Sequence, residues 1–287
     1  MPELPEVETI RQDLRKKILD KKIITVDFLH TKVAQGSTKH ITDELAGSSF
    51  TEIDRVGKLL IFKIATPDRY LLIHLKMTGQ LIYRIGEKIY AGGHSMSTLQ
   101  TELPDKHTQF IITFADGSKL YFNDLRRFGY VKIVDSLELE RIKKTYGIEP
   151  LTKTFTLEAL TTTLKHKKTI LKAFLLNQKY LAGIGNIYAD EIAHSAHLKP
   201  TRNLTTLSVH DISTLFTSIE KILAKAVKHR GTTFNNYVDS DGNKGNFSAH
   251  LKVYEQVGKP CDRCRTSLIK KTRVAGRGTY WCSECQT

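Results

Sequence analysis

The chain has 287 residues and a net charge of +14, because 44 lysines and arginines face 30 aspartates and glutamates. This length predicts two domains with room for a small third module, and the basic excess points to an anionic polymer as the partner. A hydrophobic fraction of 40%, without any apolar run long enough for a spanning helix, excludes a disordered chain and an integral membrane protein. We expect a soluble, cytoplasmic protein.

A helix is predicted over about residues 5–19, because apolar side chains recur there at three- and four-residue steps: Val7, Ile10, Leu14 and Ile18. From residue 22 to 134 short apolar runs replace this spacing and predict strands at residues 24–28, 59–62, 70–75, 110–114 and 119–122. Asp116-Gly117 marks a tight hairpin between the last two strands. Since no helical crossovers separate the runs, an antiparallel two-sheet β-sandwich or flattened barrel is expected.

After Pro150 the spacing becomes helical. Helices are predicted over about residues 157–165 and 168–176, from near Asn186, and along an apolar stripe from residue 212 to 227 that Gly231 stops. Residues 238–247 are small and polar without periodicity, which predicts a mobile loop. The chain as a whole is of the α+β class.

The end of the chain contains two Cys-x2-Cys pairs, Cys261/Cys264 and Cys282/Cys285. This spacing fits a four-thiolate site for one structural zinc ion better than it fits a redox pair or unrelated thiols. Arg277 lies on the turn of the basic hairpin between the pairs, so we expect it to contact phosphate. A solvated basic face is the alternative interpretation.

Three residues of the first sixty can carry chemistry. If Met1 is removed, Pro2 becomes a secondary amine, and an α-amino group titrates near pH 8, so a useful fraction is unprotonated and nucleophilic at neutral pH. Such an amine can form a Schiff base with a sugar carbon. Glu3 can then act as a general acid, and Lys58 can steady a phosphate or move a proton. Taken singly, such residues are more often helix-start devices and a strand-edge charge.

The order of these residues and of further motifs along the chain favours the chemical interpretation. The opening Pro2-Glu3-Leu4-Pro5-Glu6-Val7-Glu8 resembles that of the formamidopyrimidine-DNA glycosylases, bacterial enzymes that remove 8-oxoguanine and ring-opened purines. The resemblance continues over nearly the full length through Lys58, His74-Leu75-Lys76-Met77, Asp124-Leu125-Arg126-Arg127-Phe128-Gly129, Gly183-Ile184-Gly185-Asn186-Ile187-Tyr188, Gly231-Thr232-Thr233, Ser240-Asp241-Gly242, Val253-Tyr254 and the four cysteines.

The resemblance implies a fold and its division. We expect a catalytic β-sandwich domain over residues 1–135, a linker over 136–150, a helical domain with a helix–two-turn–helix element and a lesion loop over 151–250, and a zinc-finger hairpin over 251–287. The implied activity is that of a bifunctional glycosylase and apurinic-site lyase of base excision repair. It would act as a monomer on double-stranded DNA that contains oxidised purines or abasic sites.

The resemblance also implies roles for individual residues. Pro2 would attack the anomeric carbon of the damaged nucleotide, and Glu3 would be the acid that opens the sugar; the imine then permits β- and δ-elimination of the two phosphates. Four positions match phosphate contacts of the family: Lys58, His74, Asn186 and Arg277. For Asn186 the local sequence also supports a phosphate contact. A glycine-flanked turn before a helical run predicts Asn186 as an N-cap, and the free backbone amides at a helix start can bind phosphate. A cap without a ligand is the alternative.

Met77, Arg126 and Phe128 match the three side chains that the family inserts into the duplex where the base has left. Such side chains replace the lost stacking and pairing, which keeps the flipped nucleotide from returning. Met77 or Phe128 alone would be expected in a core, but the arginines beside Phe128 favour an exposed turn. Lys172 matches a basic position near the lesion, and residues 232–245 match the loop that closes over the flipped base.

Three departures from the family pattern bear on lesion preference. Leu125 stands where the family usually has proline, which loosens the turn that aims Arg126 and Phe128. Thr78 follows Met77 where some relatives carry an acid. The segment from residue 86 to 107 is longer than usual.

Two other functions stay open. Endonuclease VIII relatives remove oxidised pyrimidines with the same proline chemistry, but they resemble Pro-Glu-Gly-Pro at the start, where this chain has Leu4. A zinc-dependent DNA-binding protein without catalysis fits the charge and the cysteines. It leaves Pro2, Glu3 and the three inserted side chains unexplained.

Overall fold

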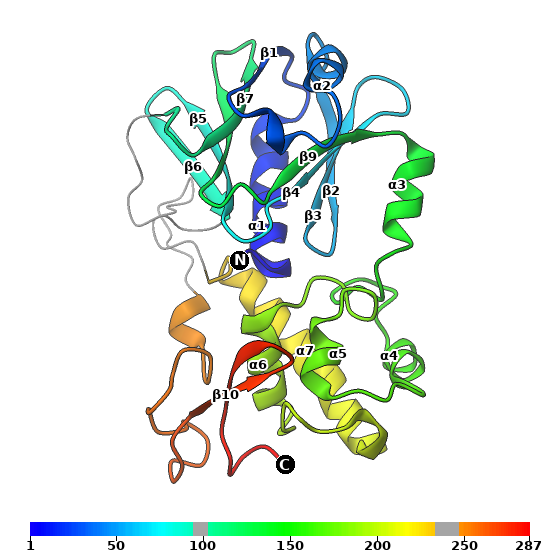
Figure 1. The fold of residues 1–287 in the computed structure, drawn as a ribbon, viewed down its shortest axis with the longest axis vertical. Helices are drawn as coiled ribbons and strands as arrows, with labels where there is room; N and C mark the ends of the chain where they lie inside the picture. Colours follow the sequence, from blue (N-terminus) through cyan, green and yellow to red (C-terminus); the bar gives the residue numbers. More distant parts are fainter. Residues whose placement is uncertain (94–102, 233–246) are drawn as a thin grey trace. The chain divides into compact units, whose positions relative to one another are not determined.

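The computed structural model describes residues 1–93, 103–232 and 247–287 (Figure 1). The chain divides into two compact units: the first contains Met1–Lys144 and the described part of His229–Asn246, and the second contains Thr145–Lys228 and Phe247–Thr287. The four-part division expected from the sequence stays a prediction; helix α3 (Ser136–Lys143) lies within the expected linker. No helix in the three described stretches is both long and apolar enough to cross a membrane.

The first unit contains the two antiparallel sheets that were predicted. One sheet has the strand order β2-β3-β4-β9 and consists of β2 (Phe50–Val56), β3 (Leu59–Ile64), β4 (Tyr70–His74) and β9 (Tyr130–Val134). The other has the order β1-β7-β8-β5-β6 and consists of β1 (Ile23–Phe28), β7 (Thr108–Phe114), β8 (Lys119–Asp124), β5 (Gly79–Ile85) and β6 (Lys88–Gly93). Apolar side chains of both sheets form one core.

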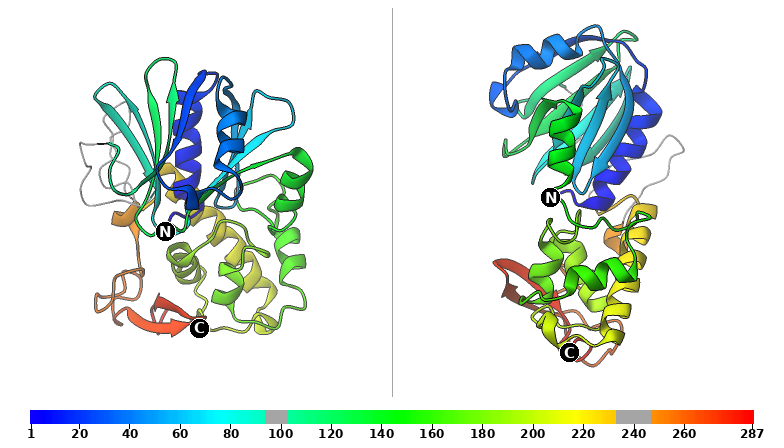
Figure 2. Two further views of the ribbon diagram at one scale, coloured as in Figure 1. Left: turned by 45° about the horizontal axis from the view of Figure 1, so that its top comes forward. Right: turned by 90° about the vertical axis from the view of Figure 1, so that its right-hand side faces the viewer.

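Helix α1 (Leu4–Ile18) closes one side of this sandwich. Its apolar stripe is buried in the core shared by the sheets, and the helix contacts β2 and β6, which are edge strands of the two sheets (Figure 2). The prediction of a helix over residues 5–19 is confirmed, with both ends one residue earlier. Two short elements complete the unit: the 3-10 turn η1 (Thr31–Val33) and helix α2 (Thr38–Leu45).

The predicted hairpin at Asp116-Gly117 joins β7 to β8. Gly117 has φ +78°, a left-handed conformation that glycine adopts without strain, and the Asp116 carboxylate accepts the Ser118 backbone N–H at 3.0 Å. The long segment from residue 86 to 107 begins with β6, and its residues 94–102 lie outside the described part of the chain. The loop expected at 238–247 also lies outside it, except for its last residue.

The second unit is helical and carries a two-stranded hairpin. Its elements are α4 (Leu157–Leu164), α5 (Leu171–Leu176), α6 (Asn186–Ser195), α7 (Val209–Lys228), the 3-10 turns η2 (Leu204–Thr206) and η3 (Phe247–His250), and strands β10 (Lys270–Val274) and β11 (Arg277–Trp281). All four predicted helices are confirmed. Helix α5 begins three residues later than predicted, because Ile170 is extended and bridges to Asn203.

Candidate functional site

The N-terminal residues predicted to carry chemistry are buried at the start of α1. Pro2 is buried, Glu3 is 1% exposed and Met1 is 40% exposed. Glu3 is the N-cap of the helix and forms a capping box with Glu6, whose Oε2 accepts the Glu3 backbone N–H at 2.9 Å. Removal of the exposed Met1 would therefore leave the proline nitrogen at a fixed position.

Glu6 also holds the segment that follows α7. Its Oε1 accepts the Thr232 backbone N–H at 2.7 Å and the Thr232 hydroxyl at 3.1 Å. Gly231 approaches so closely that a Cβ there would lie 2.5 Å from the same oxygen, and its φ is +78°. Gly231 and Thr232 are thus held against the start of α1. Beyond Thr232, the lesion loop expected at 232–245 lies outside the described residues.

Lys58 lies in the turn between β2 and β3, after Gly57 with φ +54°. A partly buried ion pair anchors this turn to α1, because Arg55 Nε lies 2.7 Å from Glu8 Oε2. The Arg55 guanidinium also donates to the Gly57 carbonyl at 3.3 Å. Lys58 is 8% exposed. The structure thus links the turn of Lys58 to the same helix that begins with Glu3.

His74 lies on β4, opposite Leu59 in the β3–β4 ladder and therefore next to Lys58. Burial, with the charges of Lys76 and Lys58, lowers the pKa of His74 to about 3. Its Nδ1 accepts the Lys76 backbone N–H at 3.0 Å, so the proton of the neutral ring is on Nε2. His74 can therefore offer a phosphate a neutral N–H donor beside the charge of Lys58.

Met77, Arg126 and Phe128 lie together on two turns. Met77 belongs to the connection between β4 and β5, and the other two belong to the connection between β8 and β9. Arg126 Nη1 donates to Met77 Sδ at 3.2 Å, and the guanidinium carbon lies 4.7 Å from the centre of the Phe128 ring. Phe128 is 52% exposed. The structure thus brings the three residues together on exposed turns rather than in the core.

Asn186 is placed differently from the prediction. The N-cap of α6 is Gly185, which has an extended backbone, and Asn186 is the first helical residue. Its Nδ2 donates to the Gly278 carbonyl at 3.0 Å, and its buried Oδ1 has no hydrogen-bond partner among the described residues. The prediction of an N-cap was wrong because the side chain reaches to the hairpin instead of folding back on its own helix.

Lys172, expected near the lesion by resemblance, is a buried residue of α5. Its side chain is 1% exposed, and its Nζ donates to Asp190 Oδ1 at 2.7 Å and to the Gly278 carbonyl at 3.1 Å. Asp190 Oδ2 accepts the Tyr280 backbone N–H at 3.0 Å. A contact of Lys172 with DNA stays a prediction. The ion pair fixes β11, whose first residue is the exposed Arg277.

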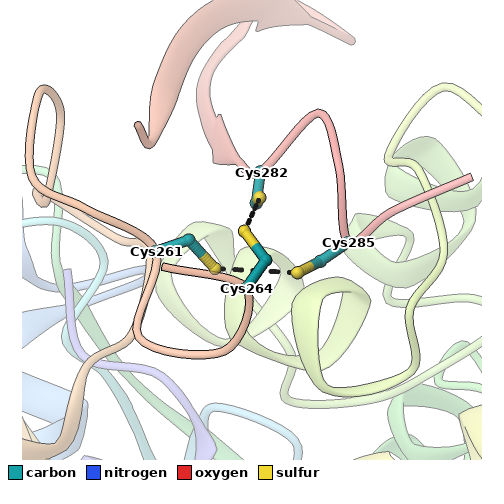
Figure 3. A group of neighbouring side chains, drawn as sticks. All are labelled: Cys261, Cys264, Cys282 and Cys285. Carbon is teal, nitrogen blue, oxygen red and sulfur yellow. Dashed lines mark hydrogen bonds between the residues drawn. The ribbon is translucent and has the colours of Figure 1, made fainter. Parts of the chain in front are cut away.

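The four cysteines converge between the two Cys-x2-Cys turns (Figure 3). The Sγ atoms of Cys261 and Cys285 are 3.7 Å apart, and those of Cys264 and Cys282 are also 3.7 Å apart. Tetrahedral zinc with Zn–S bonds of about 2.3 Å requires sulfurs about 3.8 Å apart, so the donor set fits one zinc ion. With four thiolates and no open position, this ion is structural.

Two buried residues of α6 support the zinc site, and the sequence had not singled them out. The Glu191 carboxylate accepts the backbone N–H groups of Lys252, Val253 and Tyr254 at 2.9–3.0 Å. His194 Nε2 lies 3.5 Å from Cys261 Sγ. The only hint in the sequence was the presence of charged residues at positions of α6 that a helix buries in this unit.

Comparison with known families gives matches in the order of the two units and the hairpin. Residues 1–131 match the formamidopyrimidine-DNA glycosylase N-terminal domain, residues 146–237 match the H2TH domain of the same glycosylases, and residues 258–287 match a zinc finger found in FPG and IleRS. These matches cover most of the chain and define the class as DNA glycosylases with an H2TH domain and a zinc finger.

Individual relatives agree over the full length. The chain is 41% identical to the formamidopyrimidine-DNA glycosylase of Carboxydothermus hydrogenoformans, with all of both chains covered, and 37% identical to that of Pelotomaculum thermopropionicum, covering 100% of this chain and 99% of the relative. It also resembles wild-type Lactococcus lactis Fpg in complex with DNA containing N7-benzyl-Fapy-dG, with 32% identity, TM-score 0.86 and full coverage of both chains. The chain belongs to the formamidopyrimidine-DNA glycosylase family.

Proposed function

We propose that the protein excises oxidised purines from double-stranded DNA as a DNA glycosylase and apurinic-site lyase. The full-length family match carries this proposal, since similar proteins of known structure hold DNA with a Fapy-dG lesion or an abasic site. The buried, capped start of α1 supports it, because it fixes the residue that becomes the N-terminal amine.

In the proposed reaction the Pro2 nitrogen, freed by loss of Met1, attacks the anomeric carbon of the damaged nucleotide. The bond from that carbon to the base breaks, and the base leaves with the proton that the attacking amine gives up. The nitrogen lone pair then opens the sugar, and Glu3 protonates the ring oxygen as it leaves. The resulting iminium acidifies the adjacent C2′–H. Loss of that proton expels the 3′ phosphate, and a second elimination expels the 5′ phosphate.

Four residues are proposed to bind the phosphates around the lesion: Lys58, His74, Asn186 and Arg277. Lys58 supplies charge, and His74 supplies the neutral Nε2–H deduced above. Arg277 is exposed and suits a bidentate phosphate contact. We assign Lys172 a positioning role, since its contacts with Asp190 and the Gly278 carbonyl fix the residue that follows Arg277.

Met77, Arg126 and Phe128 are proposed to fill the space left by the flipped nucleotide. The stack of Arg126 on Phe128 and its contact with Met77 support this, because a preassembled group loses little side-chain freedom on insertion. The sulfur and the ring replace stacking, and the guanidinium can hydrogen-bond the unpaired partner base.

Borohydride trapping tests the proposal. The protein is incubated with duplexes containing 8-oxoguanine opposite cytosine, an oxidised pyrimidine or an abasic site, and borohydride reduces any imine to a stable covalent complex. We expect a complex with the 8-oxoguanine and abasic duplexes. Trapping with the pyrimidine but not the purine would favour an endonuclease VIII-like activity, and binding without any trapped complex would favour a non-catalytic DNA-binding protein.

We also propose that the protein acts in the cytoplasm as a monomer, because its relatives are bacterial and each unit has its own core. Light scattering after gel filtration should give the mass of one chain. A dimer at micromolar concentration would contradict this.

A further inference from the structure

We propose that Asp124 is the positioning residue for the three side chains that enter the duplex, and that its hydrogen bond with Thr78 locks together the two turns that carry them. The inference rests on the function proposed above. It assigns roles to two buried residues that do not themselves contact DNA: Asp124 is 1% exposed and Thr78 is 7% exposed.

The two turns are neighbours because of the strand order. β4 pairs with β9 in one sheet, and β5 pairs with β8 in the other. The connection from β4 to β5 and the connection from β8 to β9 therefore cross between the sheets side by side. Asp124 is the last residue of β8 and lies opposite Gly79, the first residue of β5, so its side chain is where the β8–β9 connection begins and the β4–β5 connection ends.

The Asp124 carboxylate is bonded on both oxygens. Oδ1 accepts a hydrogen bond from the Thr78 hydroxyl and one from the Arg126 backbone N–H at 3.2 Å. Oδ2 accepts the Gly129 backbone N–H at 2.7 Å. The carboxylate thus binds both ends of its own turn, before Arg126 and after Phe128, and one residue of the neighbouring turn.

Thr78 completes the link. Its hydroxyl oxygen accepts the Arg126 backbone N–H at 3.0 Å while its proton goes to Asp124. Thr78 directly follows Met77, so one hydroxyl fixes the backbone positions of Met77 and Arg126 relative to each other. The contact between the Met77 sulfur and the Arg126 guanidinium, at 3.2 Å, depends on that spacing.

The backbone of these turns needs such a constraint. Arg127 has φ +56° and Lys76 has φ +51°, a region that non-glycine residues seldom adopt unless surrounding contacts hold them there. Gly129 has no room for a side chain, since a Cβ would lie 2.5 Å from the Phe122 ring. Leu125, half exposed, has no ring to restrict its own φ. In this chain the carboxylate supplies the restriction.

Weakening the link between the two turns should affect excision of 8-oxoguanine and cleavage at an abasic site to different degrees. Removal of a paired 8-oxoguanine requires the three side chains to displace the base and hold the space, whereas cleavage at a preformed abasic site has no base to displace. Loss of the Thr78–Asp124 bond should therefore slow the first reaction far more than the second. A purely structural role would lower both together.

The test compares Thr78→Val, Thr78→Ser and Asp124→Asn with the unaltered protein. Valine at position 78 keeps the shape of threonine without the hydroxyl, and serine keeps the hydroxyl. Asparagine at position 124 replaces one carboxylate oxygen, which accepts a backbone N–H, with an NH2 group that cannot accept it. Thr25→Val is the matched control, because Thr25 donates to Asp27 at 3.0 Å on the exposed side of β1. If Asp124→Asn does not fold, the valine and serine pair carries the test.

Three measurements are made on each variant: single-turnover excision of 8-oxoguanine, borohydride trapping at a preformed abasic site, and the fluorescence of 2-aminopurine placed opposite the lesion, which rises when that base unstacks. For Thr78→Val we expect excision to fall about tenfold and the fluorescence rise to shrink, with trapping unchanged within about twofold. Thr78→Ser and Thr25→Val should behave like the unaltered protein.

Equal losses in excision and trapping, a fluorescence rise like that of the unaltered protein, or a failure of Thr78→Ser to restore excision would each overturn the inference. Failure of the proposed function is recognised separately, because the unaltered protein would then neither excise 8-oxoguanine nor form a trapped complex at the abasic site.

Discussion

Buried charged side chains of the first unit are held by specific partners that determine their state. Burial alone would raise the pKa of Glu8, but hydrogen bonds from Arg11 and Arg55 outweigh burial and hold the pKa below its ordinary value. The carboxylate is therefore charged at neutral pH and can fasten Arg55, and with it the turn of Lys58, to α1. Single side chains thus set the geometry on which the proposed chemistry depends.

His74 should stay neutral far below the pH at which histidine ordinarily titrates. Its pKa of about 3 follows from burial and the charges of Lys76 and Lys58. Between about pH 6.5 and pH 3, His74 binds a proton in the unfolded chain but not in the folded chain. This residue therefore makes the free energy of unfolding fall as the pH drops through that range. An NMR titration of the ring protons, assigned with His74→Gln, should show no protonation between pH 8 and 5. A midpoint near 6.5 would contradict the assignment.

His194 should slow the loss of zinc. Its Nε2 lies 3.5 Å from the sulfur of Cys261, where an N–H donor would stabilise a zinc-bound thiolate. We expect His194→Phe to release zinc to a chelator about tenfold faster, measured with a metallochromic dye. His194→Gln can keep an N–H donor and is the matched comparison. Equal release rates for both variants and the unaltered protein would remove His194 from this role.

At the scale of elements, α1 links the proposed nucleophile to distant segments. The capping box of Glu3 and Glu6 fixes the helix start, and the second oxygen of Glu6 holds Thr232. Gly231 permits this approach. A substitution at the start of α1 should therefore also displace Gly231 and Thr232, and a substitution at Gly231 should displace the start of α1.

Gly231→Ala should lower the free energy of unfolding by more than the strain of a left-handed alanine alone. A Cβ at this position would lie 2.5 Å from Glu6 Oε1, whereas Gly117 has the same φ of +78° and nothing within 4 Å of its Cβ position. Both alanine variants bear the strain of a left-handed conformation, about 1 kcal/mol, but only Gly231→Ala displaces Glu6. We expect a larger drop in melting temperature and a loss of base excision for Gly231→Ala only. Identical behaviour of the two variants would refute the coupling.

The sequence predicted elements with strong periodicity and missed those without it. Helix α1, the β7–β8 hairpin and the four helices of the second unit followed from apolar spacing and turn residues. Strands β2, β5, β6 and β9 were missed, because polar, charged or glycine residues interrupt their apolar patterns and their pairing partners supply the stability. Helices α2 and α3 were missed because only two residues of α2 and one of α3 are buried.

The site was predictable where a motif is local and unpredictable where contacts are distant in sequence. The two Cys-x2-Cys pairs specified the zinc site by spacing alone. The N-cap prediction for Asn186 was wrong and the ion pair of Lys172 was not foreseen, because both side chains reach Gly278, about a hundred residues away, and apolar spacing carries no information on such a contact. The bond of Thr78 to Asp124 was hidden for the same reason.

At the scale of the whole molecule, the charge of +14 should dominate the affinity for DNA. If about six phosphates are bound, the logarithm of the binding constant should fall with the logarithm of salt concentration with a slope near −5. Arg277→Ala should reduce the magnitude of that slope by about 1 and weaken binding to damaged and undamaged duplexes alike. Binding that is insensitive to salt between 50 and 200 mM would argue against these phosphate contacts.

The central claim is that the proline nitrogen at the start of the mature chain bonds to deoxyribose. Digestion of the borohydride-reduced complex, followed by mass spectrometry, locates the attached sugar directly. We expect it on a peptide that begins at Pro2 and lacks Met1. A sugar attached to Lys58 or any other lysine, or active protein that still carries Met1, would contradict the account.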